Sequence, residues 1–85
     1  MMWRDGVVTG TRTAWGPAGR SCAELDVEIV GAPNGADGLL PGQRIRAVAY
    51  EALTGLPGAA ERVRLEVSAL DRALGTGGHA MVSSR

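Results

Sequence analysis

The residues from Ser21 to Val30 alternate strictly between apolar and polar side chains, and this alternation restricts the folds open to the chain. One set is apolar: Ala23, Leu25, Val27 and Ile29. The other set is acidic: Glu24, Asp26 and Glu28. A period of two places each set on its own face of a strand. The segment therefore predicts a strand with one buried and one solvated face, as is typical of an antiparallel sheet.

Four other segments share the features of strands, with β-branched residues and turn pairs between them. The predicted strands are residues 2–15, 21–30, 43–50, 61–68 and 79–83. Gly6 and Gly10 interrupt the first of them and indicate bulges or a bend. The connection 31–42 is longer than most loops, which favours either a mobile insertion or a functional loop. We expect a mobile insertion, because the loop holds no cluster of titratable residues.

A short helical segment is predicted before the last strand. Ser68 can cap its N-terminus, and Leu70 and Leu74 lie one turn apart. The glycines that follow, Gly75, Gly77 and Gly78, predict a helix C-cap and a hinge into the strand. They do not form a phosphate loop, because no Gly-Lys-Ser/Thr is present and the glycines follow the helix instead of preceding it.

Eighty-five residues form at most one domain with a small core. Five short strands in such a chain must curl to bury one face. We expect an all-β fold, a small five-stranded antiparallel barrel with SH3-like strand order and a short helical turn before the last strand. An OB-type barrel also has five strands. Its helix usually lies between the third and fourth strands, where residues 51–60 indicate only a connection.

The balance of charges excludes several kinds of partner. Nine basic residues, all arginine, offset nine acidic ones. A nucleic-acid partner is not expected, because such binders carry a basic surface. No apolar run approaches the ~20 residues of a membrane span, and the N-terminus lacks the pattern of a signal peptide. The chain is expected to be cytoplasmic, without membrane contact.

The residues offer little catalytic chemistry. Cys22 and His79 are the single cysteine and the single histidine, too few for an internal disulfide or a metal centre. The acidic row of the second strand faces outward near arginines, which predicts charge pairing across the sheet and not acid–base catalysis. We expect no catalytic residue, no cofactor and no metal.

Four aromatic or apolar residues form a candidate interface. Val48 and Tyr50 share strand parity with the arginines of the third strand, so they point away from the core. Trp3 and Trp15 lie on a first strand whose two faces are not cleanly sorted. Apolar surface of this kind usually marks an interface. The expected partner is a second copy, giving a homodimer, or the downstream part of the same protein. The alternative is that Tyr50 folds over the barrel end.

Several motifs resemble one protein family. They are Arg46-Ala47-Val48-Ala49-Tyr50, Leu53-Thr54-Gly55, Arg62-Val63-Arg64-Leu65 and Leu74-Gly75-Thr76-Gly77-Gly78. The stretch Ala47–Val82 resembles an uncharacterised bacterial family catalogued as domain of unknown function 3866. Trp3-Arg4 and Glu24-Leu25-Asp26-Val27 are similar to that family's start.

The chain departs from the family at Ala60-Glu61 and at Glu66-Val67-Ser68. The resemblance implies an architecture but no activity. Because family members look longer, we expect a single barrel that is the N-terminal domain of a longer protein. The expected function is a non-catalytic accessory or interaction module. The alternatives are a nucleic-acid-binding small barrel, or the N-terminal part of an enzyme whose active site lies downstream.

Overall fold

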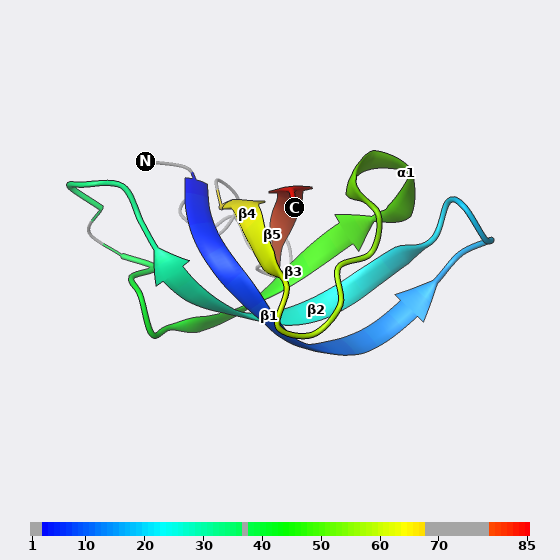
Figure 1. Cartoon of the computed structure of the whole chain (residues 1–85), viewed down its shortest axis with the longest axis horizontal. Coiled ribbons are helices and arrows are strands. Elements are labelled where there is room, and N and C mark those ends of the chain that lie inside the picture. The colour runs from blue at the N-terminus through cyan, green and yellow to red at the C-terminus, as the bar shows by residue number, and fades with distance from the viewer. Residues whose placement is uncertain (1–2, 37, 68–78) are drawn as a thin grey trace.

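A computed structural model describes residues 3–36, 38–67 and 79–85. Within these residues, five strands and one short helix follow each other in the order β1 (Trp3–Trp15), β2 (Cys22–Gly31), β3 (Arg44–Tyr50), α1 (Glu51–Thr54), β4 (Arg62–Glu66) and β5 (His79–Ser84). The strands close a barrel with the order β1-β2-β3-β5-β4 (Figure 1). The expected all-β, five-stranded barrel is therefore confirmed, and each predicted strand overlaps an observed one.

The expectation of a purely antiparallel sheet is wrong, because β5 runs parallel to β3. Their register pairs Arg46 with His79 and Val48 with Met81. On its other side β5 is antiparallel to β4. β5 lies between β3 and β4, which run in opposite directions. It is therefore parallel to one of them and antiparallel to the other. The period-two pattern gives the faces of a strand but not its neighbours, so it could not reveal this pairing.

The strand order also differs from the expected one, because β5 lies between β3 and β4. Among the described residues a short helix, α1, precedes the last strand and directly follows β3, where the sequence predicted only a connection. With a helix between the third and fourth strands and β5 inserted between β3 and β4, the barrel has the arrangement of an OB-type barrel and not the sequential SH3-like order. The helical segment predicted from Ser68 and the hinge glycines Gly75, Gly77 and Gly78 lie outside the described residues.

Among the described residues, the buried apolar side chains are all aliphatic and come from all five strands. Each apolar residue of the alternating set in β2 is at most 2% exposed, which confirms the predicted faces of this strand. The buried apolar residues are Val8, Ala23, Leu25, Val27, Ile29, Ala47, Ala49, Val63, Leu65, Val67, Ala80 and Val82. With so many alanines in the core, the barrel is narrow.

The first strand bends where its glycines lie. Its register with β2 shifts between Asp5 and Gly6, between Val8 and Gly10, and once more between Thr11 and Thr13. This agrees with the predicted bulges or bend. Gly6 faces the core, where a Cβ atom would overlap the Val27 side chain and lie 3.1 Å from Leu65 Cδ1. The strand thus needs a residue without a side chain at Gly6 to curl over the core.

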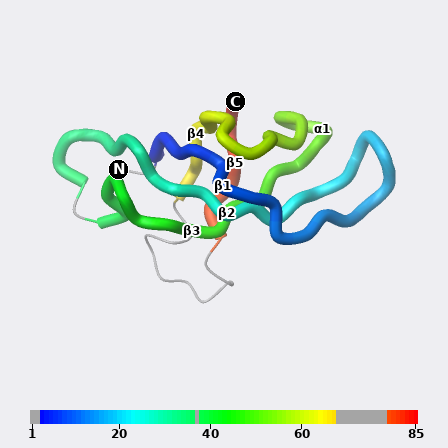
Figure 2. The backbone as a smooth tube through the Cα atoms, turned by 60° about the horizontal axis from the view of Figure 1, so that its bottom comes forward, coloured from blue at the N-terminus to red at the C-terminus, as the bar shows by residue number. Residues whose placement is uncertain are grey.

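A buried arginine closes one end of the barrel. Arg4 is 1% exposed and lies on the inward side of β1. Its Nε donates a hydrogen bond to the Leu39 carbonyl at 2.8 Å, and its Nη2 donates to the Gly38 carbonyl at 2.9 Å. Nη1 donates to the carbonyl of Trp3 at 2.7 Å. Arg4 therefore attaches the β2–β3 loop to the barrel. That loop and the β1–β2 hairpin lie at opposite ends of the molecule (Figures 1 and 2).

The contacts of Gly6 predict an asymmetric effect of two identical substitutions. Gly6→Ala should lower the free energy of unfolding by about 1–3 kcal/mol, because the added methyl group overpacks the core. Gly10→Ala is the matched control, since nothing lies within 4 Å of its Cβ position. It should change stability by no more than about 1 kcal/mol. Urea unfolding followed by tryptophan fluorescence measures both. Equal midpoints for the two variants would contradict the described packing.

Replacing Arg4 should also destabilise the fold. Arg4→Met keeps the apolar stem but removes three hydrogen bonds from a charged donor, so we expect a loss of about 2–4 kcal/mol in unfolding free energy. Arg20→Met, at an exposed position in the β1–β2 turn, is the control and should stay within about 0.5 kcal/mol of the parent. If Arg4→Met unfolded at the parent's urea concentration, Arg4 would not fix the loop to the barrel.

Candidate interaction surface

Cross-strand pairing brings three of the four predicted interface residues together on the outside of the barrel. Trp15 is opposite Cys22, which is in turn opposite Tyr50. In the adjacent row Val48 lies between Glu24 and Met81. We call the apolar members the outer apolar face: Trp15, Cys22, Val48, Tyr50 and Met81. Trp15 is 51% exposed and Met81 43%, while the other three are half-buried.

The fourth predicted residue, Trp3, lies elsewhere. It is opposite Glu66 of β4, and Glu66 separates it from Met81 of β5. The guanidinium carbon of Arg64 lies 4.3 Å from the centroid of the Trp3 ring, within cation–π range. Trp3 therefore supports Arg64 instead of extending the outer apolar face.

A carboxylate holds the β1–β2 turn beside this face. Glu51, the first residue of α1, accepts hydrogen bonds from the Ser21 hydroxyl at 2.7 Å and from the Gly19 amide at 2.9 Å. The Ser21 amide donates to the same oxygen at 3.2 Å. These bonds, led by that from the Ser21 hydroxyl, lower the pKa of Glu51 from its ordinary value of 4.5. Since Glu51 follows Tyr50 directly, the contact fixes the turn relative to the apolar residues.

The acidic row of β2 forms ion pairs next to the outer apolar face. Arg12 lies 3.1 Å from Asp26 and 3.7 Å from Glu24, measured between nitrogen and oxygen. His79 at the start of β5 also contacts the Glu24 carboxylate. This last contact could not be predicted from the sequence, because it depends on the parallel β3–β5 pairing.

The described residues contain no group of three or more His, Cys, Asp or Glu side chains that could hold a metal ion. Cys22 is a free thiol. In the same part of the chain, no helix is long and apolar enough to cross a bilayer. The chemistry gathered here is thus that of an apolar patch bordered by paired charges.

The contacts of Glu51 predict a pH-dependent contribution to stability. A carboxylate whose pKa is lowered on folding stabilises the fold above its unfolded-state pKa, and this contribution disappears as the pH falls through the folded-state pKa. Glu51→Gln should therefore unfold at lower urea concentration than the parent near about pH 7, and the gap should close towards about pH 3.

Ser21→Ala is the control for that experiment, because it removes the main donor to Glu51. In a Ser21→Ala background the effect of Glu51→Gln near neutral pH should shrink. A gap that stays constant across the whole pH range would exclude the carboxylate as its cause.

Comparison with known proteins agrees with part of the predicted resemblance. No match was found among curated proteins or among solved structures. One family model matches residues 46–85, slightly less than half of the chain. The match begins within β3 and includes α1, β4 and β5, so the predicted family resemblance is confirmed over this range. From Arg46 onward, the chain is similar to the family described as protein of unknown function (DUF3866).

Proposed function

We propose that the chain is a non-catalytic interaction module that binds a protein surface through its outer apolar face. The observation that carries this proposal is the exposure of Trp15 and Met81, which are 51% and 43% accessible on a face shared with Val48 and Tyr50. Contiguous exposed apolar side chains usually mark an interaction site. Tryptophan, tyrosine and methionine are also enriched in protein interfaces.

The charges beside this face favour a second copy as the partner. Asp26 and Glu28 of β2 lie in the same rows as Arg46 and Arg44 of β3. A two-fold contact that places β2 of one copy over β3 of the other would bring the acidic row against the basic row. The same rotation brings Cys22 over Tyr50. The face is therefore complementary to itself in charge and in apolar character, and in a longer parent protein a downstream segment would compete for it.

The paired charges support the non-catalytic part of the proposal. Arg12 binds Asp26, and Arg44 lies 4.0 Å from Glu28. Carboxylates held in such exposed pairs lack the split environments that acid–base catalysis requires. The free Cys22 thiol fits the reducing cytosol, which is the compartment that we propose.

Nucleic-acid binding is the second candidate, and the strand order favours it. OB-type barrels bind oligonucleotides on the face of their second and third strands. In this chain that face sets Glu24, Asp26 and Glu28 of β2 beside Arg44 and Arg46 of β3, so few phosphates could be neutralised there without repulsion. We therefore expect no binding of a random single-stranded oligonucleotide in a fluorescence anisotropy titration at about 50 mM salt. Micromolar binding that weakens steeply towards about 200 mM salt would favour this second function over the first.

Light scattering tests the interaction face directly. We expect the chain to shift with rising concentration from its monomer mass of 8.8 kDa towards twice that value. Met81→Glu and Trp15→Glu should hold it at the monomer mass, because a carboxylate on the face would have to be buried without a partner. Leu40→Glu is the matched control. Leu40 has the same exposed fraction as Met81, 43%, but lies in the β2–β3 loop, which is at the opposite end of the molecule from the β1–β2 hairpin (Figure 1).

Two results would contradict the proposal. One is equal self-association of the Met81→Glu and Leu40→Glu variants, which would place the contact elsewhere. The other is a strict monomer at high concentration that also fails to bind any downstream segment of the parent protein added in trans.

A further inference from the structure

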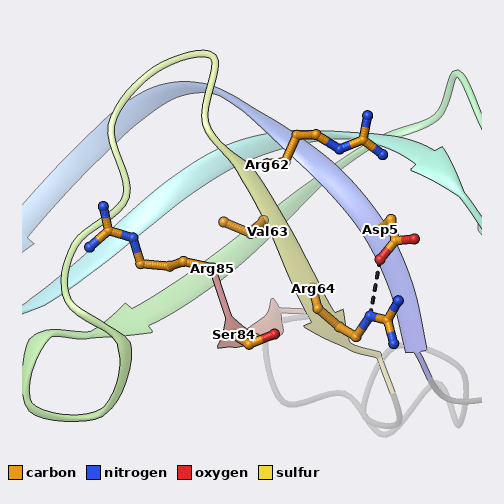
Figure 3. Close-up of a pocket in the computed structure, with 6 residues that line it drawn as sticks. All are labelled: Asp5, Arg62, Val63, Arg64, Ser84 and Arg85. Carbon is orange, nitrogen blue, oxygen red and sulfur yellow. Dashed lines mark hydrogen bonds and ion pairs between the residues drawn. The ribbon is translucent and has the colours of Figure 1, made fainter.

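The junction between β4 and β5 leaves a pocket in the side of the barrel. The two strands pair through Arg64, Leu65 and Glu66. Arg62 and Val63 continue β4 but have no partner in β5. The pocket beside this junction has a volume of about 310 Å³ (Figure 3). Its lining residues are Asp5, Arg62, Val63, Arg64, Ser84 and Arg85. None of them belongs to the outer apolar face.

One of the three arginines in the lining is held in place from two sides. Arg64 Nε donates a hydrogen bond to Asp5 Oδ1 at 3.0 Å, which Figure 3 shows as a dashed line. Its guanidinium also stacks on Trp3, 4.3 Å from the ring centroid. Both contacts leave Nη1 and Nη2 without a hydrogen bond among the described residues. Arg64 thus presents two oriented donors whose position costs little further entropy on binding.

The other two arginines differ in their partners. Arg85 donates hydrogen bonds to the Glu61 carboxylate from Nε and Nη2, and its Nη1 donates to the Thr54 carbonyl. Its charge is therefore already paired with that of Glu61. Arg62 is exposed and has no ion pair or hydrogen bond within the described part of the chain. Among the described side chains, Asp5 pairs with Arg64 and Glu61 pairs with Arg85, whereas Arg62 has no acidic partner.

We propose that this pocket binds the phosphate group of a small anionic ligand. Arg62 and the two free nitrogens of Arg64 supply the donors, and the hydroxyl of Ser84 lies in the same lining. A planar guanidinium matches phosphate oxygens in a bidentate geometry, and such charge-assisted hydrogen bonds are strong. The volume is at the lower end of small-molecule sites, which fits a phosphate with a small organic substituent. Asp5 stays bound to Arg64 and limits the site to one phosphate group.

The probe for this site is inorganic phosphate, followed by ¹H–¹⁵N correlation spectra of the backbone amides and arginine Nε groups. Ionic strength is held constant by exchange with sodium chloride. We expect a millimolar dissociation constant, with shifts concentrated at residues 62–64 and 84–85. Arg62→Gln and Arg64→Gln should each weaken binding by at least about tenfold, the effect of losing one charge-assisted hydrogen bond.

Arg20→Gln is the matched control, because Arg20 is an exposed arginine in the β1–β2 turn outside the pocket. It should bind phosphate as the parent does. Arg62→Gln removes no side-chain hydrogen bond or ion pair found among the described residues, so its spectrum should otherwise match that of the folded parent. Two results would overturn the site: absence of saturable shifts in the parent, or equal weakening by Arg20→Gln and Arg62→Gln.

Discussion

The placement of β5 between β3 and β4 is the constraint on which the rest of the structure depends. Without it, both neighbours would expose unpaired backbone groups, and the inward side chains of all strands would face water. With it, the sheet has no open edge along its central section and Leu25, Leu65 and Val82 become buried. Closure is thus achieved by one strand of six residues that pairs in opposite senses with its two neighbours.

The small radius of this barrel follows from the residues that line it. Alanines and the glycine at position 6 let the strands curl tightly, and there is no aromatic side chain among the buried residues described. Arg4 is buried together with these aliphatic residues, and its guanidinium donates to carbonyls of the β2–β3 loop. A charged residue therefore joins the barrel to that loop.

The sequence predicted local structure well and long-range pairing poorly. The faces of β2 followed from its alternation, and the bends in β1 followed from Gly6 and Gly10, because both are properties of a single strand. The parallel β3–β5 contact, and with it the His79–Glu24 pair, could not be predicted since no local pattern encodes which strands become neighbours. The inward position of Arg4 could not be predicted for a related reason. It conflicts with the charge of the side chain, and carbonyls that the fold brings to the guanidinium, including those of Gly38 and Leu39 in the β2–β3 loop, offset that conflict.

The interface itself stays a prediction, but the strand faces on which it rests can be compared with the structure. Strand periodicity placed Val48 and Tyr50 outside the core, as the structure has them. It could not separate Trp3 from Trp15, because three register shifts in β1 interrupt the alternation between them. The tryptophans consequently lie in different surroundings: Trp3 packs against an arginine, and Trp15 lies at the end of β1, separated from Tyr50 by Cys22.

The late position of β5 in the chain has a consequence for biosynthesis. The ribosome releases β1 to β4 first, and these four strands cannot form a closed barrel among themselves. Until His79–Ser84 emerges, β3 and β4 each keep one edge that is open to pairing with any extended segment nearby. Contacts between residues so distant in sequence also form slowly. The nascent chain thus passes through a stage that is prone to aggregation, which ends only when its last strand is complete.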